Sequence, residues 1–178
     1  MLKEIEIRRS ARTFSSKPIE EYKIKEILEA GRWAPSCFNN QPWNFIVLKD
    51  KETEKVHDAL NKGNYWAKNA YLIIAIAAKK DSDCISNGRE YYLFDSGLAV
   101  ENILLESYHQ GLVAHSILGF NEEIVKRNLS IPDDLRVIVL VIIGYEENLE
   151  NVDSFTREKE LFPRVRKNMN EIVHWGGW

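Results

Sequence analysis

The most informative stretches of this chain are RRSAR, at residues 8–12, and PSCFNNQPW, at residues 35–43. The first clusters guanidinium groups and a hydroxyl, which are the donors that a phosphate group prefers. The second lies between two prolines that fix the backbone, and its three consecutive amide side chains match the carbonyl and imide edge of a pyrimidine-like ring. Taken alone, the first stretch also fits a solvated basic turn and the second a polar turn that leads into a strand. Together they predict a pocket for a phosphorylated aromatic cofactor.

The composition is that of one globular domain spanning residues 1–178, because 44% of the residues are hydrophobic and 29% are charged. A formal net charge of −3 argues against nucleic acid as a partner, since that function needs a broad basic face. The longest apolar runs, residues 70–78 and 137–143, are too short to cross a bilayer. Charges at residues 3–6 argue against a secretory signal, so we expect a cytoplasmic protein without a membrane partner.

Cysteine and histidine usage gives no sign of a disulfide or a metal site. The two cysteines, Cys37 and Cys84, lack the close spacing of a redox or zinc motif, and we expect free thiols in a reducing compartment. Cys37 is interpreted as a pocket-wall residue, because no resolving partner stands near it in sequence. The four histidines lie far apart, which gives metal binding little support.

Hydrophobic periodicity predicts helices that alternate irregularly with about four strands. Helices are expected over residues 20–33, 50–61 with Asp50 as N-cap, 89–110 ended by Gly111, 121–129 capped by Asn121, and 164–175. Strands are expected over residues 44–48, 71–78, 114–118 and 137–143. This layout is α+β or mixed α/β.

The chain resembles the flavin-dependent nitroreductase family over nearly its whole length. The matching motifs are R-R-S-x-R at residues 8–12, A-P-S-x-x-N-x-Q-P-W at 34–43, D-S-G and E-N-I-L-L at 95–105, L-G-F at 118–120, and E-I-V-H-W at 171–175. The resemblance implies an α+β, nitroreductase-like three-layer fold, in which a central mixed, mainly antiparallel sheet is flanked by helices.

In that family FMN lies at the interface of a homodimer, and the resemblance carries this site over by position. The segment that holds the phosphate and ribityl chain, and reaches the pyrimidine end of the ring, corresponds to Arg8, Arg9, Ser10 and Arg12. The loop contributed by the partner subunit corresponds to Pro35, Ser36, Cys37 and Asn39.

Two further segments are implied by the same resemblance. The turn whose backbone N–H faces flavin N5 corresponds to Leu118 and Gly119, where glycine is expected to leave room for the substrate. The basic pair that closes on the phosphate corresponds to Arg164 and Arg166, and Gln41 and Asn64 are possible further contacts.

The implied activity is an FMN-dependent oxidoreductase, in which NADH or NADPH reduces the flavin and a nitroaromatic or quinone is then reduced by a ping-pong mechanism. No catalytic side chain is required, since flavin N5 carries the hydride and the protein positions it. Two alternatives stay open. One is a flavin reductase, dehydrogenase or dehalogenase of the same superfamily, and the other is a non-catalytic nucleotide-binding protein.

Overall fold

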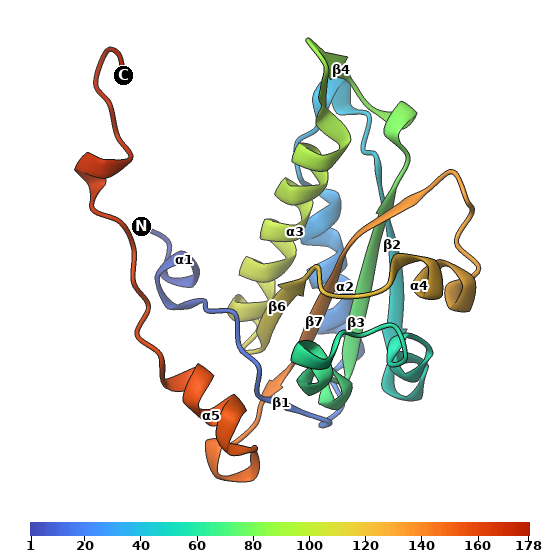
Figure 1. The fold of residues 1–178 in the computed structure, drawn as a ribbon, viewed down its shortest axis with the longest axis vertical. Coiled ribbons are helices and arrows are strands. Elements are labelled where there is room, and N and C mark those ends of the chain that lie inside the picture. The colour runs from blue at the N-terminus through green and yellow to red at the C-terminus, as the bar shows by residue number, and fades with distance from the viewer.

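A five-stranded antiparallel sheet forms the centre of the computed structural model, which describes residues 1–178 (Figure 1). Strand β7 (Arg136–Glu146) pairs along one edge with β3 (Leu72–Ala78), which in turn pairs with β2 (Trp43–Lys49). Residues 140–144 of β7 pair with β6 (Val113–Ile117), and residues 145–146 pair with β1 (Phe14–Ser15). The expected α+β fold is confirmed; the one parallel contact of this sheet is an isolated bridge between Ser10 and Ala114.

The two central strands are apolar because both faces of the sheet are covered. All seven residues of β3 are buried, and in β7 the run from Val139 to Gly144 is buried as well. Continuous apolar runs are typical of strands enclosed by layers on both sides. The sequence pattern therefore located these strands correctly.

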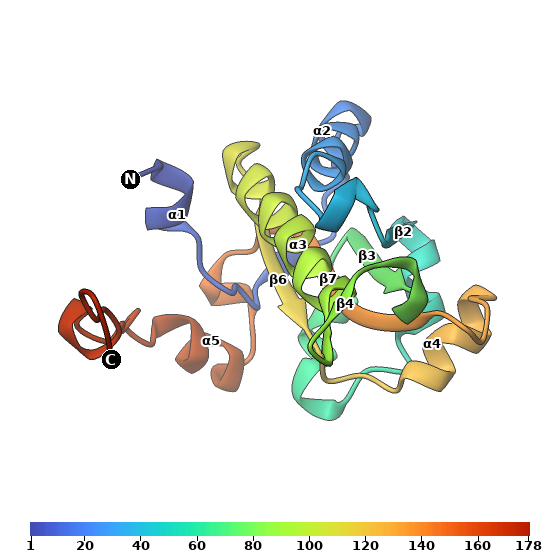
Figure 2. The same cartoon turned by 90° about the horizontal axis from the view of Figure 1, so that it is seen from above.

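Helices α2 (Glu21–Arg32) and α3 (Tyr91–His109) cover one face of the sheet (Figure 2). They approach closely at Gly31, where an added Cβ would lie 2.9 Å from the side chain of Ile103. Helix α4 (Glu122–Leu129) and the 3-10 segments η2 (Asp50–Val56) and η3 (Lys62–Asn69) cover the other face. The molecule thus has the three layers that were expected.

The remaining elements lie around this body. A short hairpin of β4 (Ile85–Ser86) and β5 (Arg89–Glu90) stands at the start of α3, and α1 (Lys3–Ile7) and α5 (Ser154–Leu161) lie outside the layers (Figure 1). The other 3-10 turns are η1 (Cys37–Asn39), η4 (Lys80–Ser82), η5 (Leu149–Asn151) and η6 (Met169–Glu171). None of the helices combines the length and the apolar character that crossing a bilayer requires.

Local capping signals explain which helix boundaries were predicted correctly. The side chain of Asn121 accepts a hydrogen bond from the N–H of Ile124 at 3.1 Å, and Gly111 follows α3 with φ +75°. These confirm the expected N-cap and the expected glycine after the long helix.

Two predicted helices are wrong. The stretch 50–61 forms the 3-10 segment η2 over residues 50–56 and then a turn, and Asp50 takes a left-handed conformation (φ +53°) instead of capping a helix. The last α-helix spans Ser154–Leu161, not 164–175, because Asp153 caps it through the N–H of Thr156 and Pro163 follows its end. Beyond this helix the chain runs past α1 and away from the sheet, with one 3-10 turn (Figure 1).

Candidate functional site

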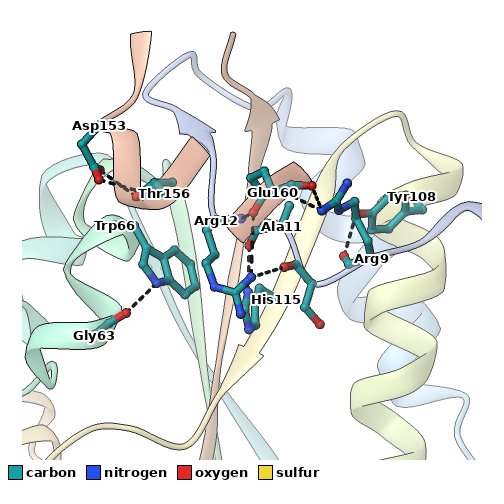
Figure 3. Close-up of polar contacts among 11 residues, drawn as sticks. Arg9, Ala11, Arg12, Gly63, Trp66, Tyr108, His115, Asp153, Thr156 and Glu160 are labelled. Atoms are coloured by element: carbon teal, nitrogen blue, oxygen red, sulfur yellow. Dashed lines mark hydrogen bonds and ion pairs between the residues drawn. The ribbon is translucent and has the colours of Figure 1, made fainter. Parts of the chain in front are cut away.

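Residues 8–12 form an extended segment that is held along β6 and α3. The hydroxyl of Tyr108 donates to the backbone oxygen of Arg9 at 2.7 Å, and Nδ1 of His115 lies 2.8 Å from the backbone oxygen of Ala11 (Figure 3). Ala11 is fully buried. These contacts fix the backbone of the segment, so the positions of its arginine side chains are set by the core.

A carboxylate already occupies part of this cationic cluster. Glu160 of α5 has a side chain only 3% exposed; its Oε2 lies 3.3 Å from Nη2 of Arg9 (Figure 3). Its Oε1 accepts from the backbone N–H of Arg12 at 2.5 Å, and its backbone oxygen accepts from the Arg9 guanidinium. One carboxylate among three guanidinium groups leaves a local charge of +2 (3 − 1), so the cluster can still bind an anion.

Arg8 is the arginine of this cluster whose side chain is best suited to bind an anion. Its Nε is buried and has no hydrogen-bond partner in the chain. Buried donors without a partner are rare in folded proteins and each one requires an explanation. A phosphate group beside Arg8 supplies the missing acceptor, so the donor set of residues 8–12 fits the phosphate that the sequence predicts.

His115, which contacts residues 8–12, belongs to a stack of three aromatic rings. His115 stacks on Trp66 with ring centroids 4.8 Å apart, and Trp66 stacks on Phe14 at 5.6 Å. Burial, with a smaller contribution from the cations of Arg12 and Arg8, lowers the pKa of His115 to about 4. The imidazole is therefore neutral at pH 7 and adds no charge to the site. No feature of the sequence predicted that His115 would support the backbone of residues 8–12.

A cavity of about 350 Å³ adjoins the basic segment. Its charged lining residues are Arg12, Lys68, Glu147 and Asp153. Two cations and two carboxylates balance one another, so this cavity does not select an anion by charge.

The loop over residues 35–41 is constrained by its own polar groups. The N–H of Cys37 donates to Asp95 at 2.6 Å, and the N–H of Gln41 donates to the hydroxyl of Ser36 at 2.9 Å. Phe38, Asn39 and Gln41 have φ of 48°, 58° and 49°. Left-handed conformations at such residues cost free energy and persist only where neighbouring contacts enforce them.

Not all the amides of this loop are free to meet a ligand. The amide of Asn40 donates to Asp83 at 3.2 Å, and that of Gln41 donates to the backbone oxygen of Asn39 at 3.1 Å. The side chain of Asn39 is exposed and makes no hydrogen bond within the chain, and Pro35 is also exposed. Asn39 is thus the amide that remains available.

The expectation of two free cysteines is wrong, because Cys37 and Cys84 form a disulfide. The bond joins the loop after α2 to the segment before β4, with Cα atoms 6.1 Å apart. A separation of 47 residues carries no sequence signal for such a contact. The pairing arises only because α2 and α3 pack side by side and bring these two loops together.

Asp95 is a functional candidate that sequence reasoning missed. It lies on α3, is only 2% exposed, and orients the loop by accepting from the N–H of Cys37. Burial and the neighbouring Asp83 raise the pKa of its carboxyl. The available signal was that Asp95 is the one charged residue in the first half of α3.

The turn after β6, Leu118 and Gly119, has an open backbone donor. The N–H of Gly119 makes no hydrogen bond within the chain, and the side chain of Leu118 is 75% exposed. Glycine at position 119 also leaves room for a side chain of the protein itself. An added Cβ would lie 2.4 Å from Nδ2 of Asn64, which donates to the oxygen of Gly119 at 3.0 Å. Glycine makes room for Asn64 inside the protein.

The two C-terminal arginines lie outside the cluster in a single chain. Arg164 donates to the backbone oxygen of Glu6 in α1, two residues from Arg8. Arg166 is exposed, and its one hydrogen bond within the chain goes to the neighbouring Val165 at 2.9 Å. The loop over residues 35–41 stands at the opposite end of α3 from residues 8–12 (Figure 1). One chain therefore brings together residues 8–12 and β6 but not the other predicted segments.

The chain is similar to known proteins in sequence and in fold. The model of the nitroreductase family matches residues 5–145. A protein of Archaeoglobus fulgidus, provisionally named NADH dehydrogenase/NAD(P)H nitroreductase, is 32% identical over 99% of this chain and 98% of its own length. An iodotyrosine deiodinase of Haliscomenobacter hydrossis is 28% identical over 78% of this chain and 75% of its own. The crystal structure of an oxidoreductase containing FMN superposes with a TM-score of 0.88 at 27% identity, covering 99% of this chain and 91% of that one.

Proposed function

Since this chain belongs to the nitroreductase family of oxidoreductases, we propose that it binds FMN and uses NADH or NADPH to reduce a nitroaromatic or quinone. The observation that carries the proposal is the basic segment held along β6, in which a buried donor of Arg8 lacks a partner. A solved oxidoreductase of the same fold contains FMN, which supports the choice of cofactor.

The residues of this chain have the task of binding and orienting the cofactor. Arg8, Arg12 and the hydroxyl of Ser10 bind the phosphate and the sugar chain, while Arg9 remains paired with Glu160. The free N–H of Gly119 would be available to the reactive edge of the bound ring. Bound FMN supplies the redox chemistry, accepting a hydride from the nicotinamide and passing it to the acceptor.

In this proposal NAD(P)H and the electron acceptor bind one after the other at the same site, beside the exposed side chain of Leu118. Such alternate binding predicts ping-pong kinetics. No general acid or base is needed among the side chains. The proposal places the protein in the cytoplasm, where NADH and NADPH are present.

We further propose that the site is completed by a second copy of the chain. The partner contributes Pro35, Ser36, Cys37, Asn39 and Gln41, which lie far from residues 8–12 within one chain (Figure 1). The C-terminal segment carries exposed apolar side chains, which a partner subunit would cover: Phe162, Val165, Met169, Ile172, Trp175 and Trp178. Large exposed apolar surfaces of this kind mark interaction sites. Arg164 and Arg166 then reach a phosphate at the interface.

The experiment that tests the cofactor is a visible absorption spectrum together with a fluorescence titration of FMN. We expect a yellow protein that quenches or shifts flavin fluorescence at one FMN per chain. A protein that stays colourless after incubation with FMN, and leaves the fluorescence of the flavin unchanged, contradicts the proposal.

A second candidate reaction is reductive dehalogenation, because an iodotyrosine deiodinase is among the similar proteins. Steady-state rates with a nitroarene, a quinone, free flavin and an iodinated phenol distinguish the candidates. Turnover of the iodinated phenol alone would assign the protein to the dehalogenases. Turnover of free flavin alone would assign it to the flavin reductases.

A further inference from the structure

Cys37, Asp83 and Cys84 form a cluster of metal-ligating side chains outside the basic segment. Cys37 lies in the turn after α2, and the other two residues lie between η4 and β4. One ligand atom from each residue, the two sulfurs and a carboxylate oxygen, lies within 4.8 Å of the other two.

This set of ligands suits a thiophilic divalent cation. Zn²⁺ binds thiolates at about 2.3 Å in tetrahedral geometry, which places two sulfurs roughly 3.8 Å apart. The two Cα atoms are 6.1 Å apart, a distance that each thiolate can span to a shared metal through its own side chain. Reduction of the disulfide therefore leaves the two sulfurs close enough to bind one ion without rearrangement of the backbone.

Asp83 is the observation that points to a cation. Its Oδ1 accepts from the N–H of Cys84 at 2.8 Å and from the amide of Asn40 at 3.2 Å, which fixes the carboxylate. Its Oδ2 is buried and has no partner. A buried carboxylate oxygen without a donor is costly, and a bound cation removes that cost.

Neither Asp83 nor Asp95 forms a salt bridge with a basic side chain. The two nearest lysines in sequence are paired elsewhere, Lys79 with Asp134 at 3.0 Å and Lys80 with Glu90 at 2.5 Å. A second carboxylate, Asp95, accepts a hydrogen bond from the N–H of Cys37 at 2.6 Å. This contact orients the loop over residues 35–41, which carries Cys37. Outer contacts of this kind orient metal ligands and strengthen binding.

We propose that the reduced form of the protein binds Zn²⁺ through Cys37, Cys84 and Asp83, with water as the fourth ligand. A dithiol reductant breaks the S–S bond, donates two electrons and two protons, and leaves as its own disulfide. The metal then displaces the two thiol protons to solvent. Disulfide and metal are mutually exclusive, so the loop over residues 35–41 is tied to the hairpin segment in either state.

The test uses the full-length purified protein, oxidised or reduced by a phosphine that is removed before metal is added. Zinc content after dialysis is measured by mass spectrometry, and Co²⁺ is added as a spectroscopic probe. We expect one zinc per chain in the reduced protein and none in the oxidised protein. We also expect the thiolate-to-cobalt charge-transfer band of a tetrahedral site, in a difference spectrum against the same protein without cobalt.

Variants assign the ligands. Cys84→Ser should abolish binding, and Asp83→Asn, which alters a direct ligand, should weaken it by more than the roughly 10-fold that loss of an outer contact costs at the least. Asp81→Asn, an exposed carboxylate two residues away, is the matched control and should bind zinc like the wild type.

A measurement on the wild-type protein tests the site even if a variant fails to fold. Zinc should protect both thiols of the reduced wild type from alkylation by iodoacetamide. Equal zinc content in the oxidised and reduced proteins, or alkylation that zinc does not slow, overturns the proposal. Neither measurement depends on bound FMN, so failure here leaves the proposed function untouched.

Discussion

Arg8 illustrates how a single side chain carries information that only the folded chain reveals. The sequence shows a cluster of arginines and predicts an anion, but it does not show which of them is free. The structure assigns Arg9 to Glu160 and leaves the buried Nε of Arg8 without a partner. The three residues are chemically equivalent in sequence, and only their tertiary contacts distinguish them.

We predict that Arg8→Ala weakens FMN binding by roughly 30-fold. This corresponds to the loss of a charge-assisted hydrogen bond of about 2 kcal/mol. The dissociation constant is measured by titration of flavin fluorescence. Arg127→Ala, at an exposed position of α4, is the control and should leave the affinity unchanged. Equal affinities for wild type and Arg8→Ala would remove Arg8 from the site.

His115 predicts a dependence of stability on pH. Burial and the cations of Arg12 and Arg8 lower its pKa in the folded state from 6.5 to about 4. Between these values the unfolded chain binds more protons than the folded chain, so the folded state is stabilised above pH 6.5 and loses this contribution as the pH falls toward 4. The contribution reaches at most about 3 kcal/mol, since each pKa unit corresponds to about 1.4 kcal/mol.

The measurement is urea denaturation of the wild type and of His115→Gln from pH 7.5 to pH 4. The difference in unfolding free energy between the two proteins should shrink as the pH falls, because only the wild type loses the histidine contribution. The comparison cancels the carboxyl groups that both proteins share. A difference that stays constant across this range would mean that His115 titrates normally.

The secondary-structure elements were predictable where the chain itself supplied the signal. Strands β3 and β7 are buried on both faces and appear as continuous apolar runs, and Asn121 caps α4 through its own side chain. The helix predicted over residues 50–61 is wrong because Asp50, its expected N-cap, takes a left-handed conformation and the following residues form a 3-10 segment. The last helix was misplaced because its docking depends on Glu160, whose partners lie some 150 residues away in sequence.

We predict that Glu160→Gln destabilises the folded state by about 1–2 kcal/mol. The substitution leaves the Arg9 guanidinium without its carboxylate partner, and the partial exposure of that guanidinium limits the cost. Urea denaturation monitored by circular dichroism gives the free energy. Glu158→Gln, an exposed position of the same helix, should change it by less than about 0.5 kcal/mol. Similar losses for both variants would show that the effect is general to α5.

At the scale of the whole molecule, one chain holds only part of the proposed site. Within one chain, Ser10 of the basic segment pairs with Ala114 of β6 through an isolated bridge, and the turn at Gly119 follows the end of the same strand. The loop over residues 35–41 and the C-terminal arginines lie elsewhere, a separation that no analysis of local sequence pattern could predict. The Cys37–Cys84 disulfide could not be predicted for the same reason, because the contact between these two loops depends on how α2 and α3 pack.

The C-terminal segment predicts the oligomeric state of the whole molecule. Residues 162–178 expose Trp175 and Trp178 almost completely, at 92% and 104%, on a chain that runs away from the sheet (Figure 1). Isolated in water, such side chains lose the free energy that burial provides, about 25 cal/mol per Å² of apolar surface. A second subunit that covers them recovers it. The full-length protein should therefore sediment as a dimer.

A chain ending at Leu161 should sediment as a monomer and lose its FMN, because it lacks both the apolar contacts of the segment and its two arginines. Circular dichroism checks that the truncated chain is folded, since the sheet and its covering layers remain complete. The double variant Arg164→Ala/Arg166→Ala keeps the apolar side chains and separates the two roles. It should remain a dimer while its affinity for FMN falls. A full-length monomer that carries one FMN per chain contradicts the shared site, since residues 35–41 could then reach no flavin at all.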